Sequence, residues 1–414
     1  MPARGVMAID SGVSARHAVR GAAAVWTVAG GLAGVFVLST APTPLYEGYR
    51  QAFGFSRLTL TLVYAVYVAG TIAAMFFLGR LSDQIGRRPV VLAALGVAGM
   101  ASAAFLLAGS TAWLFAARVL SGLAIALASG ASTAWILELH PRRDNARATQ
   151  IALAANSLGL ALGPLIAGAL AQYAPAPLRL PYLACALLLV AATALIWPSQ
   201  ETVTDPRTLA QASMRPRLGV PRDIRRDFAS PAIAAFATFS VLGFYSALIP
   251  GVLQQALHIE SSAAAGAIVG ALFLVATAII ATFPQVSPRS GMIIGLVLLL
   301  PGVACLVVAE AVHSLALLLL ATAIGGAATG LGYRFGLQMV NELSPKDQRS
   351  EVISSYLIVC YVAISLPVIG VGLLAGAAGS LVADATFGGV IVALGIAALA
   401  IELRGSRRAV PSRP

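Results

Sequence analysis

The chain has 414 residues, of which 59% are hydrophobic and 10% charged, and its mean hydropathy is +0.88. Soluble domains carry about 25% charged residues, so this composition excludes a soluble domain and predicts an all-α protein that crosses a lipid bilayer many times. A net charge of +11 would suggest a nucleic-acid ligand in a soluble protein. In a membrane protein it indicates arginines that hold loops on the cytoplasmic side, and we expect no nucleic-acid partner.

A helix that spans the bilayer needs about 20 apolar residues. Twelve candidate runs lie at residues 21–43, 58–78, 90–109, 111–138, 149–172, 181–198, 230–252, 263–284, 291–309, 314–341, 351–375 and 382–402. The tail before the first run carries Arg4, Arg16 and Arg20. Because that run is long enough to span the bilayer, we expect a retained helix rather than a cleaved signal peptide.

The distribution of Lys and Arg predicts the orientation. With both termini in the cytoplasm, 22 of the 27 basic residues lie on the inner side, and the outer side holds 3: Arg50, Arg57 and Arg179. Arg118 and Arg334 lie within the membrane. The excess predicts cytoplasmic termini, and we expect a multi-pass protein of a bacterial inner membrane.

The longest polar stretch divides the chain into three predicted parts. These are an N-terminal six-helix bundle (1–198), a cytoplasmic linker (199–229) and a C-terminal six-helix bundle (230–414). Gly122, Glu138, Pro141 and Pro164 recur as Gly326, Glu342, Pro345 and Pro367, at offsets of 204, 204, 204 and 203. A repeat in one orientation predicts two bundles related by a parallel pseudo-two-fold axis, with the substrate site between them.

A charged loop, residues 79–89, separates the second and third runs. Gly79 permits a close helix turn and Gly86 a left-handed backbone, while Asp83 can cap a helix start and Arg87 and Arg88 can bind lipid headgroups or neighbouring acids. The order G-x-L-x-D-x-x-G-R-R resembles the signature loop between helices 2 and 3 of the major facilitator superfamily.

This resemblance implies that Asp83 and Arg87 are gating residues that clasp the cytoplasmic helix ends in the outward-open state. The matching loop of the second half, residues 285–291, keeps Arg289 but has no acid. We therefore expect an asymmetric gate.

Arg118 and Arg334 each lie about 12 Å from the end of a predicted membrane helix, where burying an unpaired charge is costly. The stretch from Arg118 to Gly122 resembles the R-x-x-x-G motif of helix 4 of the superfamily, which implies proton coupling. An inter-helix hydrogen-bond donor is the structural alternative. For Arg334, ligand binding and snorkelling toward the cytoplasmic surface explain the position equally well.

The fifth run contains a further candidate region. Asn156, Gly159 and Gly163 share one face of the helix, Pro164 removes a backbone hydrogen bond, and Gly168 follows one turn later. The pattern resembles the helix 5 signature of the superfamily's antiporters, although a seam of tight helix packing explains it equally well.

Aromatic residues supply the remaining substrate candidates: Tyr64, Tyr67, Tyr245 and Tyr361. None of the 16 acids is expected near the midplane, and Glu47 and Asp384 are the nearest alternative titrating groups. Arginines without acidic partners favour a neutral or anionic compound.

Cys185, Cys305 and Cys360 lie in apolar runs, which indicates buried thiols rather than a disulfide or metal site, and we expect no metal or cofactor.

These observations predict a secondary transporter, not an enzyme, that works by alternating access as a monomer. The resemblance implies efflux of a small organic compound or drug by proton antiport. Uptake or release of an organic anion or neutral metabolite is the main alternative. A non-transporting membrane sensor or scaffold is a remote alternative. Such a protein would be expected to have lost motif residues from the loop at residues 79–89, whereas Asp83 and Gly86 are present.

Overall fold

The computed structural model describes residues 21–140, 145–208, 211, 219–345 and 347–408. The long helices are α1 (Ala22–Thr40), α3 (Arg57–Leu78), α5 (Arg87–Leu106), α6 (Thr111–Leu139), α7 (Asn145–Tyr173), α8 (Leu180–Ile196), α9 (Arg225–Gln255), α10 (Ser262–Thr282), α11 (Pro288–Ala311), α12 (Leu315–Leu343), α13 (Arg349–Ala378) and α14 (Ser380–Arg408). Short elements are η1 (Thr43–Leu45), α2 (Tyr46–Phe53), α4 (Leu81–Ile85) and η3 (Arg222–Ile224). The tail arginines, Pro141 of the predicted repeat and most of residues 209–218 lie outside the described residues.

Each predicted run coincides with one long helix. Eleven helical stretches are long and apolar enough to cross a membrane, and α8 is apolar but has 17 residues. At 1.5 Å per residue, α8 covers about 25 Å, slightly less than the hydrocarbon core. The first stretch continues through η1 into α2, because Pro42 and Pro44 interrupt the α-helical hydrogen bonds without turning the chain into a loop.

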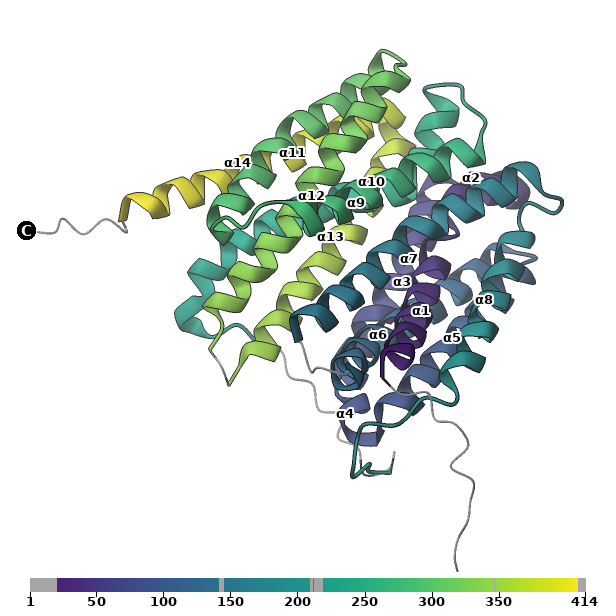
Figure 1. Cartoon of the computed structure of the whole chain (residues 1–414). Coiled ribbons are helices and arrows are strands. Elements are labelled where there is room, and N and C mark those ends of the chain that lie inside the picture. The colour runs from purple at the N-terminus through teal and green to yellow at the C-terminus, as the bar shows by residue number, and fades with distance from the viewer. Residues whose placement is uncertain (1–20, 141–144, 209–210, 212–218, 346, 409–414) are drawn as a thin grey trace, which may run out of the picture.

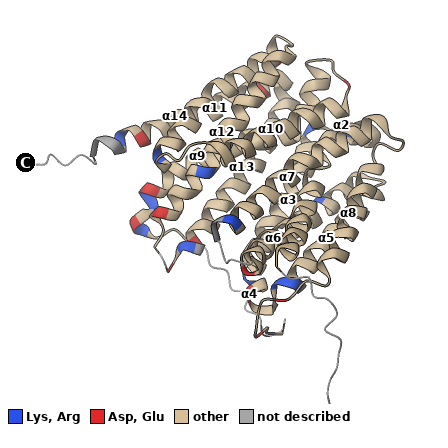
Figure 2. Cartoon of the chain, viewed as in Figure 1, with Lys and Arg blue, Asp and Glu red and all other residues tan. Residues whose placement is uncertain are grey.

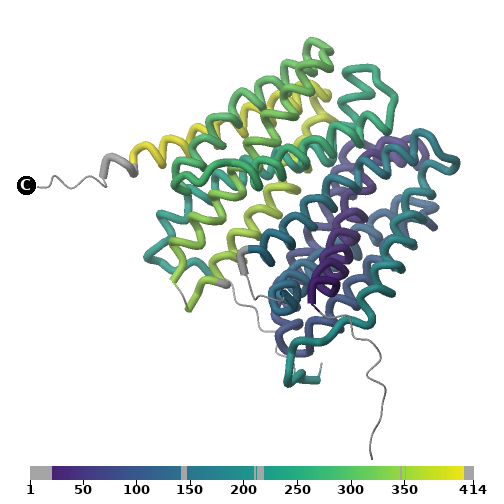
Figure 3. Tube along the Cα trace, viewed as in Figure 1, coloured from purple at the N-terminus to yellow at the C-terminus, as the bar shows by residue number. Residues whose placement is uncertain are grey.

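The helices form two groups that follow the chain order. Helices α1, α3 and α5–α8 pack against one another, and α9–α14 form the second group. The tube in Figure 3 passes from the purple-to-teal group into the green-to-yellow group. Between the groups, α7 packs on α10 and α3 on α13 (Figure 1).

Charged residues gather near the helix ends, and the helix bodies are largely uncharged (Figure 2). We call the end at residues 79–89 the gate-loop end and the opposite end, with α2 and the start of α14, the far end. The ribbons of the two groups meet at the far end and diverge toward the gate-loop end (Figure 1). The far end is the side that the charge distribution predicts to be outside the cell.

Small residues allow the two groups to approach at the far end. A Cβ atom at Gly168 of α7 would clash with the Ser262 carbonyl of α10, and one at Gly266 would clash with the Pro164 carbonyl. The Gln172 side chain accepts a hydrogen bond from the Ser262 N–H at 3.0 Å. The α7–α10 contact is therefore a close backbone crossing of the small-residue type.

Candidate functional site

A cavity lies between the two groups of helices, with a volume of about 1180 Å³ including the part open to solvent. Its described lining comes from both groups: Phe36, Ser39, Thr40, Thr43, Tyr64, Tyr67, Arg118, Ile125, Leu153, Asn156, Ser157, Leu160, Phe239, Leu242, Ser246, Phe273, Ala276, Thr277, Ile280, Thr329, Gly330, Tyr333, Leu357, Cys360, Tyr361 and Ile364. Most of these side chains are apolar or aromatic, and several carry hydroxyls. Arg118 is the one formally charged residue in this lining.

Arg118 is 1% exposed, and its guanidinium connects three helices. From α6, Nη1 donates to the Ser39 carbonyl of α1 at 2.8 Å, and Nη2 donates to the Tyr64 carbonyl of α3 at 3.2 Å. The guanidinium carbon lies 4.2 Å from the Tyr67 ring centroid and 5.5 Å from that of Tyr64. Nε has no hydrogen-bond partner. Carbonyl oxygens and π faces thus stabilise this charge in place of a carboxylate.

Four of the predicted substrate residues line the cavity together: Tyr64, Tyr67, Asn156 and Tyr361. The Tyr64 and Tyr67 rings meet edge to face with centroids 5.6 Å apart. The structure thus brings residues of α3, α7 and α13 to the same cavity as Arg118.

Two other candidates, Arg334 and Tyr245, lie outside the described lining of this cavity. Arg334 is absent from the cavity lining; its Nη1 donates to the carbonyls of Ile280 and Phe283 at 3.0 and 2.9 Å. These carbonyls lie at the end of α10, where intrahelical partners run out. Tyr245 is 1% exposed, is also absent from the lining, and accepts a hydrogen bond from Thr322 at 3.3 Å.

The lining also includes Thr329 and Tyr333 of α12, which the sequence analysis did not single out. On α12 the cavity residues are Thr329, Gly330 and Tyr333, a set at spacings of one, three and four residues. Thr329 and Tyr333 share a helix face, and this spacing was the available signal.

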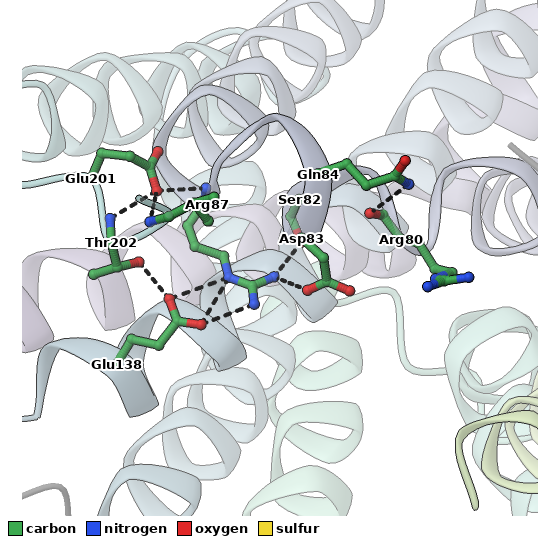
Figure 4. A network of polar contacts seen from close by, with 9 residues as sticks. Arg80, Ser82, Asp83, Gln84, Arg87, Glu138, Glu201 and Thr202 are labelled. Atoms are coloured by element: carbon green, nitrogen blue, oxygen red, sulfur yellow. Dashed lines mark hydrogen bonds and ion pairs between the residues drawn. The ribbon is translucent and has the colours of Figure 1, made fainter. Parts of the chain in front are cut away.

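The gate loop is held by ion pairs within the first group (Figure 4). Arg87 pairs with Asp83 and, at 2.9 Å, with Glu138 of α6, and it donates to the Ser82 hydroxyl at 2.9 Å. Gly86 has φ +114°, which favours glycine, whereas Gly79 has an ordinary helical φ of −58°. The Asp83 side chain is 56% exposed, so its carboxylate is accessible to a further partner.

The start of the predicted linker packs on this loop, which the sequence analysis did not anticipate. The Glu201 carboxylate accepts hydrogen bonds from the backbone N–H groups of Arg87, Arg88, Thr202 and Val203 at 2.8–3.0 Å. It therefore caps the N-terminus of α5, where backbone donors and the helix dipole favour an anion. A Cβ atom at Gly86 would lie 2.6 Å from a Glu201 carboxylate oxygen.

The corresponding loop of the second half makes a different contact. Arg289 pairs with Glu402 of α14 at 2.9 Å, whereas Glu342, the predicted counterpart of Glu138, lies within hydrogen-bond distance of Gln338. The described contacts of the two loops therefore differ. This agrees with the sequence, since residues 285–291 contain Arg289 but no acid.

The conspicuous glycines of α6 and α7, which are Gly122, Gly159 and Gly163, lie at helix contacts. A Cβ atom at Gly122 of α6 would clash with the Tyr67 carbonyl of α3, and Cβ atoms at Gly159 and Gly163 would clash with backbone of α1. Pro164 lies within α7, which continues past it to Tyr173. These contacts are seams of tight helix packing, and the antiporter role of the helix 5 pattern stays a prediction.

Comparisons with known proteins agree with this architecture. The Major Facilitator Superfamily profile matches residues 27–286. Multidrug resistance protein 2 of Bacillus subtilis (strain 168) is 22% identical over 49% of this chain and 50% of its own length. The major facilitator-type transporter psiT2 of Psilocybe cyanescens is 39% identical over 26% of this chain and 20% of its own length. The matched regions thus span half or less of these curated relatives.

Two solved structures share the fold across nearly the whole chain. A bacterial homologue of the human lysosomal transporter Spinster, solved in an inward-facing and unoccupied conformation, superposes with a TM-score of 0.71 at 16% identity, covering 93% of this chain and 96% of its own. The nucleoside transporter NupG (D323A mutant) gives a TM-score of 0.73 at 13% identity, covering 91% and 99%. The profile match over more than half of the chain, together with this fold, places the protein in the Major Facilitator Superfamily.

Proposed function

We propose that this protein is a secondary transporter that exports a small organic compound by alternating access, in exchange for protons. The central cavity carries the proposal, because side chains from both helix groups line it and relative movement of the groups would change its access. The relative named as a multidrug resistance protein supports export over uptake.

The arrangement of the two ends supports a state open toward the cytoplasm. At the far end, α3 and α7 of the first group contact α13 and α10 of the second. At the other end, the ion pairs of Asp83 and Arg87 stay within the first group. The exposed Asp83 carboxylate would then contact the second group when the gate-loop end closes.

The lining of the cavity favours a neutral or anionic cargo over a cation. Arg118 contributes positive charge, and its partners are carbonyls and aromatic rings. A cation would have to approach this charge in a low-dielectric site. Transport of an organic anion or neutral metabolite is therefore the second candidate, and Arg118 is the observation that favours it.

Flux measurements in proteoliposomes under an imposed pH gradient test the proposal. The panel contains cationic, neutral and anionic aromatic compounds of similar size. Proton-driven movement of a neutral or anionic compound is expected. Anion flux without proton movement would refute proton antiport, and flux confined to cations would refute the role given to the cavity charge.

A further inference from the structure

A cluster of two buried carboxyls and one half-buried arginine joins the two helix groups at the far end, outside the central cavity. Arg57, at the start of α3, donates from Nη2 to both carboxylate oxygens of Asp384 on α14, at 3.0 Å each. The Glu310 carboxyl of α11 lies against the Asp384 carboxyl, close enough for the two groups to share a hydrogen bond. Asp384 is 2% exposed and Glu310 6%. We call these residues the far-end cluster.

Charge balance in the far-end cluster requires a proton. Two carboxylates cannot hydrogen-bond to each other, so Glu310 and Asp384 can share a hydrogen bond only when one of them supplies an O–H group. With Arg57 compensating Asp384, an ionised Glu310 would add an unpaired negative charge at a buried site, which costs several kcal/mol. A protonated Glu310 that donates to Asp384 leaves the cluster neutral and its polar atoms paired.

The neighbouring ionisable groups either have other partners or are exposed to solvent. Glu47 of α2 pairs with Arg50, and the His313 Nδ1 contacts the Ala256 carbonyl while its ring stacks on His258. Glu260 is exposed at the same end, where it lines a surface pocket with Glu47.

A small pocket of about 280 Å³, again including open solvent, lies between the groups and is lined by Arg57, Glu47, Arg50 and Gln255 among others. The Arg57 side chain is 17% exposed, so it contacts solvent on this side.

We propose that one proton, taken up from the far side and shared between Glu310 and Asp384, is required for Arg57 to close the far end. Closure buries the carboxyl pair against Arg57, and opening removes Arg57 and exposes both carboxyls to water. Because the closed end holds one proton more than the open end with both acids ionised, lower pH favours closure by linkage. The inference rests on alternating access in the proposed function, but not on proton exchange with cargo.

The distance between two spin labels tests this inference without substrate. Labels at exposed Ala52 of α2 and Ala377 of α13 report the far-end separation, with the three native cysteines replaced by alanine and the protein in lipid nanodiscs. Between about pH 5 and about pH 8, the closed-to-open ratio should fall as pH rises, by up to about tenfold per pH unit, the limit for one proton. A pH-independent ratio in the wild type would overturn the inference.

Variants identify the group that binds the proton. Glu310→Gln should keep the far end closed across the pH range, since its amide donates to Asp384 at every pH. Glu260→Gln is the matched control and should respond like the wild type. A wild-type response in Glu310→Gln, or loss of the response in His313→Gln instead, would refute the assignment.

If the Glu310 variant fails to fold, infrared spectroscopy can detect the shared proton in the wild type instead. The wild type should keep the carbonyl stretch of a protonated carboxyl at neutral pH, and Asp384→Asn should shift that band. A wild type without the band would refute the shared proton. Both readings are independent of transport, so a failure of the proposed efflux activity leaves them interpretable.

Discussion

Substitution of Arg118 separates the charge of the cavity from its shape. Arg118→Met keeps a long side chain but removes the guanidinium. Ser39 lies next to the end of α1, where intrahelical donors run out, so its carbonyl loses a charged donor, at a cost of about 1.5–3 kcal/mol. An anionic substrate in the same cavity should lose a contribution of the same order, which corresponds to roughly a ten- to hundredfold weaker Kd.

Equilibrium binding of matched anionic and neutral aromatic compounds to the purified protein is the assay. Anion affinity should fall in Arg118→Met while the affinity for the neutral analogue stays within about twofold. Arg118→Lys keeps the charge, but one ammonium cannot replace a planar fork that reaches carbonyls on α1 and α3, so it should recover little. Equal losses for both compounds would leave Arg118 a purely structural role, and unchanged affinity for both would refute the reasoning.

Three further substitutions test the gate and the far end. Asp83→Asn should impair transport in vesicles without reducing membrane insertion, because the amide cannot form the ion pair of the closed gate; unchanged transport would contradict a gating role. Glu201→Gln removes one acceptor and the charge at the N-terminus of α5, so it should cost about 1–2 kcal/mol and increase hydrogen exchange in residues 199–208; wild-type exchange would argue against the cap. Gly168→Leu forces a side chain against the Ser262 carbonyl, so strain of about 1–3 kcal/mol should open the far end in the spin-label assay, whereas Gly130→Leu, which faces open space, should not.

Local properties of the sequence were sufficient to predict the helices and the position of the short charged connection at residues 79–89, which contains the short helix α4. The length of each apolar run depends on neighbouring residues alone, and every predicted run coincides with a long helix. The loop of residues 79–89 could be predicted in the same way, because all residues of its motif lie within one short stretch of the sequence. Gly86 illustrates the reason. Its backbone φ of +114° favours glycine, so the residue type alone indicates the local conformation.

Tertiary packing decided which buried charges share a site. Arg118 contacts the cavity while Arg334 binds the end of α10, although both lie at a similar depth in their helices. The rotation of each helix about its axis, which packing sets, determines where such side chains point. Arg57, Glu310 and Asp384 come from three helices far apart in the sequence, so their individual positions near helix ends predicted no shared site. Only the fold brings these charges together, and the cost of burying them unpaired determines how they interact.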